Sequence, residues 1–274
     1  MAKTSKQERV FVAGHTGLVG SSVMRRLHGL GYDDVVGRDV AQLDLTDAVA
    51  TRAFFEEMRP SYVVLAAAKV GGIHANNTFP ADFIRINLQI QTNVIDAAHR
   101  TGVKKLLFLG SSCIYPKHAP QPMKEEHLLT GPLEPTNDAY AIAKIAGILM
   151  TQAYNRQHGT NFIAAMPTNL YGPGDNFDLN TSHVLPAMVR KFVEAKDQKK
   201  AEVELWGTGS PRREFLFVDD LADALVFLLE NFDATGERDN FVNVGVGEDI
   251  SIDALAALVR EVVGYEGKIA WNAS

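Results

Sequence analysis

Short apolar runs alternate with longer segments of mixed polarity along the first two thirds of the chain. Five of the runs are short and continuous enough to form buried strands, at 9–14, 34–38, 62–68, 104–110 and 161–167. Four of the intervening segments repeat apolar residues at helical spacing, at 18–32, 47–58, 80–102 and 138–159. Strands that alternate with helices of this length are typical of repeated βαβ units. The pattern therefore predicts an α/β fold built on a doubly wound parallel sheet.

The pattern changes after Tyr171. Residues 172–183 are rich in Gly, Asp and Asn and show no periodicity. The further elements that we expect are a helix at 186–197, a strand at 203–206, a strand and helix at 214–231 and a late helix at 249–264. We predict a large domain at 1–170, to which residues 214–233 return, and a smaller lobe at 171–274. The cleft between two such domains is the default place for a ligand.

The composition narrows the classes of function. Hydrophobic residues make up 46% of the 274 residues and charged residues 22%, which are the values of a folded globular protein. The net charge is −6 and no basic block is present, which argues against nucleic-acid binding. A single cysteine favours a reducing compartment, and no apolar run is long enough to span a membrane. We therefore expect a cytoplasmic protein without nucleic-acid or membrane partners.

Gly14, Gly17 and Gly20 mark the turn between the first predicted strand and the first predicted helix. Glycines in this position let backbone amides approach a pyrophosphate at the positive end of a helix. The spacing G-x-x-G-x-x-G differs from the usual G-x-G-x-x-G, so the place of the loop between strand and helix carries the prediction of dinucleotide binding. A plain tight turn is the alternative interpretation.

The second predicted strand ends in two adjacent charged residues that favour different dinucleotides. Asp39 could accept a hydrogen bond from the ribose 2′-hydroxyl of NAD, whereas Arg38 could bind the 2′-phosphate of NADP. Asp44, a few residues further on, could meet the adenine. Each of the three is as readily interpreted as an ordinary polar loop residue, so the residues alone leave the choice open.

Tyr140 and Lys144 lie four residues apart on a predicted helix and therefore share one face. A lysine ammonium beside a phenol stabilises the phenolate, so we expect the pKa of Tyr140 to be lowered toward neutrality. Tyr140 would then serve as a general acid or base. An exposed helix pair is the alternative, but Ser111 at the end of the preceding strand favours a catalytic set of serine, tyrosine and lysine.

Cys113, the only cysteine of the chain, lies two residues after Ser111. Alternation along an extended chain places both side chains on one side, at the edge where open α/β sheets bind ligands. A reactive thiol needs its pKa lowered by a nearby cation or hydrogen-bond donor, so we expect that shift for Cys113. The alternative is burial in the core as a small apolar side chain.

Longer stretches of the chain resemble the extended short-chain dehydrogenase/reductases that act on nucleotide sugars. They are the glycine loop, LAAAKVGG at 65–72, GSSCIYP at 110–116, YAIAK at 140–144 and PTNLYGP at 167–173. Within that family, the stretches most similar to the branch that converts GDP-4-keto-6-deoxy-D-mannose to GDP-L-fucose are 66–84, 105–117, 133–147, 166–177 and 182–187. The resemblance runs from about residue 9 to the end of the chain. It implies a Rossmann-type sheet, NADP(H) as cofactor, a GDP-sugar substrate and a homodimer formed through the helices at 80–101 and 138–158.

The resemblance also implies the role of individual residues. Ser111, Tyr140 and Lys144 would reduce the C4 ketone, and Cys113 and His183 would be the base and acid that epimerise C3 and C5. The cofactor contacts that it implies are Gly14, Thr16, Gly17, Leu18, Val19, Gly20, Arg38, Asp44, Leu45, Ala66, Ala67, Ala68, Tyr140, Lys144, Pro167, Asn169, Leu170 and His183. The substrate contacts that it implies are Ser111, Ser112, Cys113, Asn169, Lys191, Trp206 and Arg213. It implies no metal ligand.

Three departures from the family pattern bear on these expectations. Thr16 stands where the family often has an arginine, which leaves Arg38 to bind the 2′-phosphate of NADP. Lys191 stands where an arginine is common, so the charge is kept but the bidentate fork is lost. The family continues for several tens of residues beyond residue 274, so we expect the lobe to be incomplete at its C-terminus.

Two other functions remain as alternatives to the one that the resemblance implies. They are another nucleotide-sugar epimerase or dehydratase with tightly bound NAD, and a non-catalytic dinucleotide sensor.

Overall fold

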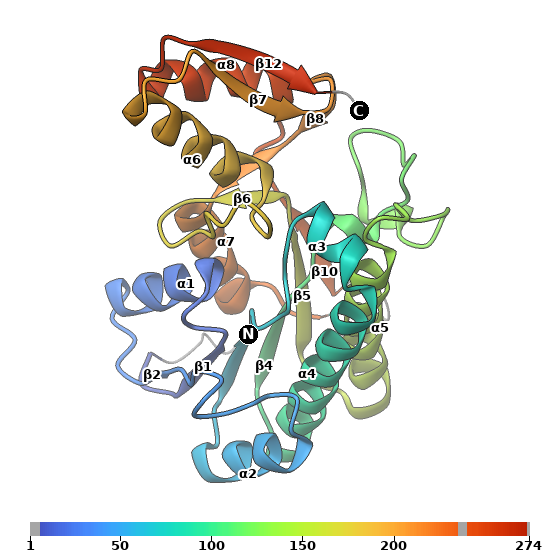
Figure 1. The fold of residues 1–274 in the computed structure, drawn as a ribbon. Coiled ribbons are helices and arrows are strands. Elements are labelled where there is room, and N and C mark those ends of the chain that lie inside the picture. Colours follow the sequence, from blue (N-terminus) through green and yellow to red (C-terminus); the bar gives the residue numbers. More distant parts are fainter. Residues whose placement is uncertain (1–5, 235–239, 273–274) are drawn as a thin grey trace.

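The computed structural model describes residues 6–234 and 240–272, and these form a larger and a smaller part that lie one above the other (Figure 1). The larger part contains a six-stranded sheet with helices on both faces. The smaller part stands over one end of that sheet. Among the described residues, no helix is long and apolar enough to cross a membrane.

Every pair of neighbouring strands in the large sheet is parallel, in the order β10-β5-β4-β3-β1-β2. Its strands are β1 (Val10–Ala13), β2 (Val35–Val36), β3 (Tyr62–Leu65), β4 (Lys105–Leu109), β5 (Phe162–Pro167) and β10 (Phe241–Val244). The chain moves outward from β1 to β2 and then crosses to β3, so the strand order reverses next to β1. Open α/β sheets bind ligands at such a reversal. The predicted doubly wound parallel sheet is confirmed.

Alternation along the strands builds one apolar core on each face of this sheet. Phe11, Val63 and Phe108 belong to the first core, which packs under α2 (Ala48–Met58), α4 (Pro80–Thr101) and α5 (Asp138–His158). Val12, Val64 and Leu107 belong to the second, which packs under α1 (Leu18–Gly29) and α7 (Val218–Asn231). Because both faces are buried, these strands are continuously apolar instead of alternating with polar residues.

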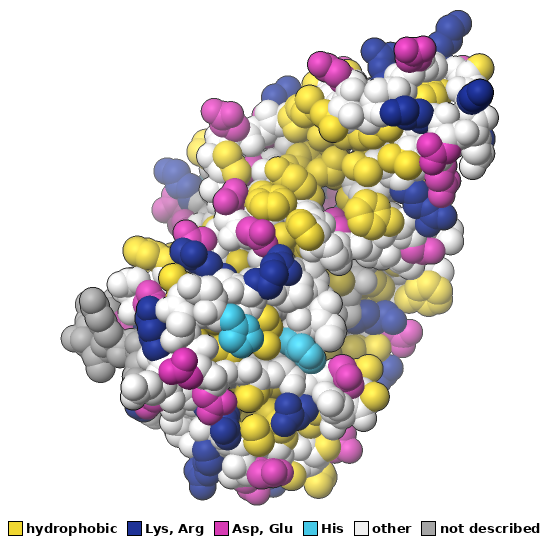
Figure 2. All heavy atoms as spheres, turned by 90° about the vertical axis from the view of Figure 1, so that its left-hand side faces the viewer, with side chains coloured by type: hydrophobic (Ala, Val, Ile, Leu, Met, Phe, Trp, Pro, Cys, Tyr) yellow, Lys and Arg dark blue, Asp and Glu magenta, His cyan; other side chains and the backbone are white. Residues whose placement is uncertain are grey.

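The smaller part has an apolar core of its own, which includes Met188, Phe192, Val203 and Tyr265. Its main elements are α6 (Val184–Asp197), β7 (Glu202–Trp206), α8 (Ile252–Val263) and β12 (Lys268–Asn272), with β7 and β12 paired in parallel. Two further strand pairs connect the parts: β6 (Asn169–Tyr171) with β9 (Phe215–Phe217), and β8 (Arg212–Arg213) with β11 (Ile250–Ser251). Figure 2 shows hydrophobic side chains on the surface of this part and at its junction with the larger part.

The structure adds elements that the apolar pattern did not predict. A short helix α3 (Ile73–Thr78) precedes α4, and β10 joins the large sheet beside β5, although residues 241–244 fall inside the predicted lobe. α7 packs against α1, so residues of the predicted segment 214–233 lie against the larger part. Residues 1–5, 235–239 and 273–274 of the two predicted domains lie outside the described residues. The division into two domains stays a prediction.

Candidate active site

The glycine loop allows two parts of the backbone to approach too closely for side chains. Gly14 has φ +83°, and a Cβ added to it would lie 2.7 Å from the backbone nitrogen of Ala67. A Cβ on Gly20 would lie 2.0 Å from the carbonyl oxygen of Gly14. The amide of Gly17, the N-cap of α1, donates to the same oxygen at 3.0 Å. The loop therefore leaves the first amides of α1 beside the sheet end, where they suit a pyrophosphate.

The other predicted cofactor contacts near this loop lie on the elements that adjoin it. Thr16 is exposed in the loop, and Leu18 and Val19 begin α1 after Gly17. The three alanines that follow β3, Ala66, Ala67 and Ala68, are half-buried, and the first of them is bonded to β1 through Ala13. These residues all lie near the point where the strand order reverses, and folds of this kind bind dinucleotides at that point.

The two charged residues after β2 make different hydrogen bonds. The carboxylate of Asp39 accepts from the backbone amides of Ala41 and Gln42, both at 3.0 Å, and so stabilises its own turn. The guanidinium of Arg38 donates to the carbonyl of Gly37 at 2.8 Å and lies 5.8 Å from the ring centroid of Phe54. Arg38 keeps further donors, whereas Asp39 is engaged locally.

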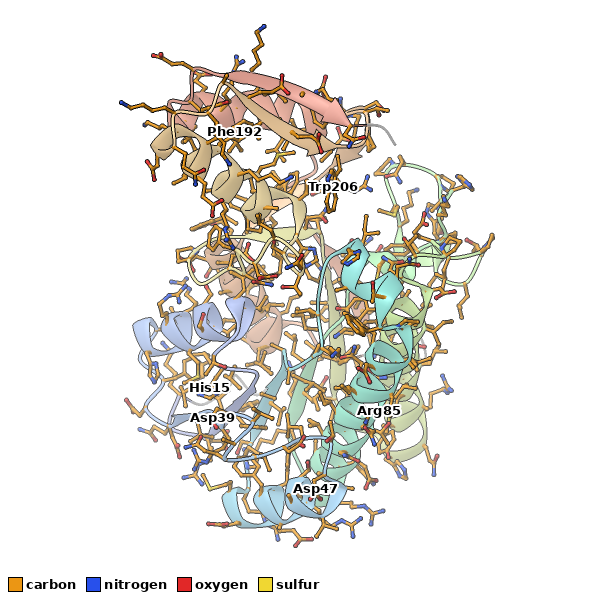
Figure 3. The ribbon with its side chains drawn as sticks, in the orientation of Figure 1. His15, Asp39, Asp47, Arg85, Phe192 and Trp206 are labelled. Atoms are coloured by element: carbon orange, nitrogen blue, oxygen red, sulfur yellow. The ribbon has the colours of Figure 1, made fainter. Side chains whose placement is uncertain are left out.

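Sequence reasoning missed His15, which stands inside the glycine loop. Its ring packs on Gly37, where an added Cβ would lie 2.2 Å from His15 Cγ. His15 Nδ1 is buried and has no hydrogen-bond partner among the described residues. Figure 3 shows His15 and Asp39 on the same side of the sheet. The position of His15 next to Thr16 could have indicated it, because several of the cofactor contacts that the family resemblance implies lie in this loop.

Asp44 and Leu45, the predicted adenine contacts, form a turn that is joined to α4. The carboxylate of Asp44 accepts from the amide and the hydroxyl of Thr46, at 2.9 and 2.8 Å, and these bonds lower its pKa. Leu45 is buried, and its carbonyl accepts from Asn93 Nδ2 at 2.9 Å. The turn is therefore held in place independently of any ligand.

Ser111, Cys113, Tyr140 and Lys144 meet where β4 ends. Ser111 is the N-cap of the short helix η1 (Ser112–Ile114), and its Oγ accepts from the amide of Cys113 at 3.4 Å and is bonded to Tyr140. Lys144, only 3% exposed, donates from Nζ to the carbonyl of Leu109 at 2.7 Å. The lysine ammonium lies 5.7 Å from the ring centroid of Tyr140. One turn of α5 therefore places the phenol and the ammonium beside the end of the strand.

Burial reverses two of the pKa shifts that we expected at this strand end. The pKa of Cys113 is raised to about 11, because burial outweighs the lowering effects of the Ser111 hydroxyl and the Lys144 charge. Burial also raises the pKa of Tyr140, a nearby Cys113 thiolate adds to the increase, and Ser111 opposes it. Burial lowers the pKa of Lys144 to about 8. The expected lowering of the thiol and phenol pKa was therefore wrong for the unliganded protein.

The loop after β3 connects this strand end to His183. The ring of Tyr140 packs edge-on against Phe83 at 6.2 Å between centroids, and a Cβ on Gly71 would lie 3.2 Å from Phe83 Cζ. The amide of Gly72 donates to the carbonyl of Thr181 at 3.0 Å, and His183 follows two residues later as the N-cap of α6. Because Gly71 and Gly72 have no side chains, the loop can pack between the predicted catalytic residues at the end of β4 and His183.

Two buried asparagines, which sequence reasoning also missed, hold that loop. Asn87 donates to the carbonyl of Lys69 at 3.0 Å and accepts from the amide of the same residue at 2.8 Å. Asn76 donates to the carbonyls of Gly71 at 2.7 Å and Gly72 at 3.0 Å. In the sequence, the two asparagines stand as amide side chains within amphipathic segments. The helical pattern alone places such polar residues on the surface.

His183 itself is exposed at the start of α6. Its pKa is lowered because the surrounding protein removes part of its hydration, and the charge of Asp175 opposes that shift. Asp175 lies within the stretch 166–177 that resembles the family.

Of the predicted substrate contacts on the smaller part, Trp206 and Arg213 are exposed and Lys191 is half-buried. Trp206 is 68% exposed on the side of β7 that faces the larger part (Figure 3). The ammonium of Lys191 lies 5.2 Å from the indole centroid and donates to the carbonyl of Glu204 at 3.0 Å. Arg213 donates to the carbonyl of Arg212 at 2.7 Å. The indole and the lysine form one surface that suits stacking and an anionic group.

The remaining predicted contacts follow β5. Pro167 is buried at the end of that strand, and Asn169 and Leu170 form β6. Asn169 Nδ2 donates to the carbonyl of Glu214 at 3.0 Å, which joins β6 to the start of β9. The Glu214 carboxylate accepts from the amide of Gly247 at 2.8 Å, and no ion pair with Arg213 is found among the described residues.

Comparison with known proteins places this arrangement in a family. The sequence profile of the NAD dependent epimerase/dehydratase family matches residues 10–245. The chain belongs to the NAD dependent epimerase/dehydratase family. Its similarity to a probable GDP-L-fucose synthase 1 of Oryza sativa subsp. japonica is 63% identity over 270 residues, which are 98% of this chain and 81% of that protein. Its similarity to the GDP-L-fucose synthase of Escherichia coli strain K12 is 52% identity over 273 residues, 98% of this chain and 85% of that protein.

Solved structures are also similar to this chain. A GDP-mannoheptose C4 reductase from Campylobacter jejuni with NADP bound has 38% identity and a TM-score of 0.91, over 98% of this chain and 89% of that one. The resemblance to the family found in the sequence is thus confirmed.

Proposed function

We propose that this protein is an NADPH-dependent enzyme that epimerises C3 and C5 of GDP-4-keto-6-deoxy-D-mannose and reduces its C4 ketone, giving GDP-L-fucose. The observation that carries the proposal is the meeting of Ser111, Cys113, Tyr140 and Lys144 at the end of β4, in a chain 63% identical to a probable GDP-L-fucose synthase. The thiol could act as the base that removes a proton from a sugar carbon. The neighbouring serine, tyrosine and lysine could supply a proton to the alkoxide that forms on reduction.

The residues present fit NADP(H). Gly14 and Gly20 let the loop backbone pack closely against Ala67 and against itself, and the amides at the start of α1 would hold the diphosphate. Arg38 would hold the 2′-phosphate, since Asp39 is engaged in its own turn. Lys144 would hold the nicotinamide ribose hydroxyls. When bound, NADPH supplies the hydride that reduces C4.

Tyr140 would protonate the C4 oxygen during reduction. Its raised pKa keeps the phenol protonated at neutral pH, so the proton is in place before charge develops on the substrate. The hydroxyl of Ser111, already bonded to Tyr140, would donate to the same oxygen. Lys144, with a pKa of about 8, would stabilise the phenolate that remains.

Epimerisation would use one proton carrier on each side of the sugar. The C4 ketone acidifies the hydrogens on C3 and C5, the Cys113 thiolate would remove one, and the C–H electron pair would move to the C4 oxygen. His183 would return a proton to the opposite face of the same carbon. Because the pKa of Cys113 is about 11, only a small fraction of the thiol is ionised at neutral pH before substrate binds.

The test is an assay of NADPH oxidation with GDP-4-keto-6-deoxy-D-mannose, combined with deuterium uptake at C3 and C5 from heavy water. We expect stoichiometric NADPH consumption, deuterium at both carbons, and loss of consumption in Tyr140→Phe. Deuterium uptake or turnover without consumption of added NADPH would contradict the proposal in favour of an enzyme with tightly bound NAD. Binding of NADPH without any conversion of the keto-sugar would contradict it in favour of a sensor.

We also propose a division of labour between two domains, with residues 1–170 and 214–233 binding NADP and the rest of 171–274 binding the GDP-sugar. The separate core around Phe192 supports this division, and β10 is the exception because it pairs with β5. Trp206, Lys191 and Arg213 would contact the substrate from the second domain, Asn169 from the junction, and Ser112 from the first.

A cytoplasmic homodimer is the assembly that we propose. Helices α4 and α5 pack side by side, and Ile142 and Leu149 of α5 are exposed seven residues apart, on one stripe of the helix. The unpaired Cys113 suits a reducing compartment. Sedimentation equilibrium of Leu149→Lys tests the interface: we expect a monomer, and an unchanged dimer would place the contact elsewhere.

A further inference from the structure

Asn76 of α3 is a buried polar residue to which the proposed reaction gives no role. It is only 6% exposed. Its Nδ2 donates to the carbonyl oxygens of Gly71 at 2.7 Å and Gly72 at 3.0 Å, whereas its Oδ1 is buried and has no hydrogen-bond partner among the described residues. Burial of an unpaired amide oxygen costs free energy, so the two donated bonds are what this side chain contributes.

The two carbonyls that Asn76 binds belong to the loop after β3, where this loop touches residues 181 and 182. The amide of Gly72 donates to the carbonyl of Thr181 at 3.0 Å. A Cβ added to Gly72 would lie 2.6 Å from the carbonyl oxygen of Ser182, so the two backbones approach too closely for a side chain at position 72. Asn76 therefore holds Gly72 by its carbonyl, while Thr181 holds it by its amide.

Residues 181 and 182 lead directly to His183. They belong to a closed turn, in which the amides of Thr181 and Ser182 both donate to the carbonyl of Asp178, at 3.2 and 2.8 Å. His183 follows this turn as the N-cap of α6. The main chain that carries His183 is thus bounded by α6 on one side and by a turn in contact with Gly72 on the other.

The other end of the same loop is fixed beside the residues at the end of β4. Asn87 of α4 accepts from the amide of Lys69 at 2.8 Å and donates to its carbonyl at 3.0 Å. Phe83, also on α4, lies where a Cβ on Gly71 would be 3.2 Å from its Cζ, and its ring packs edge-on against Tyr140 at 6.2 Å between centroids. The loop therefore joins the surroundings of Tyr140 to the turn before His183.

We propose that Asn76 is a positioning residue for epimerisation, which holds the loop after β3 against residues 181 and 182 and so fixes the main chain of His183 relative to Cys113. This rests on the proposed function for the roles of His183 and Cys113, but the contact between the two loops does not. Epimerisation needs a proton carrier on each face of one carbon, so it depends on the spacing of these two residues. Reduction uses the residues at the end of β4. A misplacement of about 1 Å can slow a reaction about 10²-fold.

The test compares Asn76→Asp with Asn240→Asp, a matched control from the other end of the sheet. Asn240 is fully buried, its Nδ2 donates to Thr151 Oγ1 at 2.8 Å and to the carbonyl of Phe162 at 3.0 Å, and its Oδ1 also lacks a partner among the described residues. It lies just before β10, whereas the candidate active site lies where the parallel strands end. Both substitutions keep the shape of the side chain and remove the two donated bonds, so urea denaturation should show similar losses of stability.

In turnover, Asn76→Asp should slow formation of the epimerised sugar about 10²-fold and leave reduction of a sugar that is already epimerised within about twofold. Asn240→Asp should leave both rates within about twofold. A merely structural role for Asn76 would lower both rates by the same factor, and that result would overturn the inference. An unchanged rate of epimerisation in Asn76→Asp would overturn it as well.

A second measurement follows the contact itself, without substrate or cofactor. By NMR-detected hydrogen exchange, protection of the Gly72 amide should fall about tenfold in Asn76→Asp and stay unchanged in Asn240→Asp. Unchanged protection in Asn76→Asp would overturn the inference. If protection fell as expected but the wild type did not turn over the GDP-sugar, the proposed function would fail and the contact between the loops would stand. If Asn76→Asp failed to fold, Asn76→Ala, which places no carboxylate beside the two carbonyls, would decide by the same measurements.

Discussion

The two groups of predicted site residues lie in opposite environments. In the first group, at the end of β4, Lys144 is buried and the other residues are half-buried. The group is bonded to the main chain: Lys144 to the carbonyl of Leu109, and Ser111 to the amide of Cys113. In the second group, on the smaller part, Lys191 is half-buried, Arg213 is exposed, and Trp206 offers most of its indole to solvent. We therefore expect reduction at the first group, where a parallel sheet fixes the backbone, and recognition of the GDP-sugar on the second group, which is a surface that can adapt to a ligand.

The comparison also separates two sources of reactivity. At the buried end of β4, loss of hydration shifts the pKa of the thiol, phenol and ammonium toward their neutral forms. At His183 the desolvation is opposed by one carboxylate, that of Asp175. In the first group the thiol and the phenol therefore stay neutral at pH 7, whereas Lys144, with a pKa of about 8, stays mostly protonated.

The largest effect that separates the groups is expected for Lys144→Met. Reduction should fall by about 10³-fold, since the phenolate loses its cation. The free energy of unfolding at pH 7 should nevertheless rise by about 2 kcal/mol. The substitution removes the cost of shifting the lysine pKa from 10.5 to about 8, which is about 3 kcal/mol, but it also removes a hydrogen bond that stabilises the fold by about 1 kcal/mol. Urea denaturation measures the change.

The sign of the pH dependence follows from the direction of that shift. The folded pKa of Lys144 is depressed, so its cost is fully present below about pH 8 and disappears as pH rises toward the unfolded value of 10.5. The advantage of Lys144→Met should shrink over the same interval. Lys105→Met is the control: that buried lysine is paired with Asp233 at 2.7 Å, so its loss should destabilise. A destabilised Lys144→Met would contradict the account of burial.

Cys113→Ser should have the next largest effect. Deuterium exchange at C3 and C5 should slow by about 10²-fold, because a serine hydroxyl is a much weaker acid than a thiol. Reduction of the epimerised sugar should stay within about twofold, because Ser111, Tyr140 and Lys144 are intact. Wild-type exchange in the variant would remove Cys113 from the mechanism and leave it as a packing residue.

The unliganded thiol offers a second measurement on the same residue. Alkylation of Cys113 by iodoacetamide should be slow at pH 7 and rise about tenfold per pH unit until pH approaches 11. A plateau near pH 8 would show that the site lowers the pKa of the thiol after all.

The smallest effect is expected on the exposed surface of the smaller part. Trp206→Ala should raise KM for the GDP-sugar about tenfold with kcat within about twofold, because the exposed indole would bind the GDP-sugar away from the reacting carbons. Phe227→Ala, an exposed aromatic change on α7, should leave both constants unaltered. A fall in kcat without a change in KM for Trp206→Ala would erase the contrast between the two groups.

The order of strands and helices was predictable because each element has a local cause. Asp47 caps α2 with its carboxylate, Gly102 and Gly159 end α4 and α5 in the left-handed conformation, and the buried strands are continuously apolar. β10 was not predictable, because its place beside β5 depends on contacts between residues almost eighty positions apart. The short helix α3 follows Gly72, where a buried Asn76 replaces an apolar pattern.

The sequence by itself determined which chemical groups this protein has and the elements that carry them: the glycine loop, the spacing of Tyr140 and Lys144, and the stretches that resemble its family. Only the tertiary structure decided how those groups behave. It buried Lys144, raised the pKa of Cys113 by removing its hydration, and engaged Asp39 in its own turn. The physical reason is that helix, strand and turn preferences act over a few residues, whereas hydration and charge depend on everything that packs around a group.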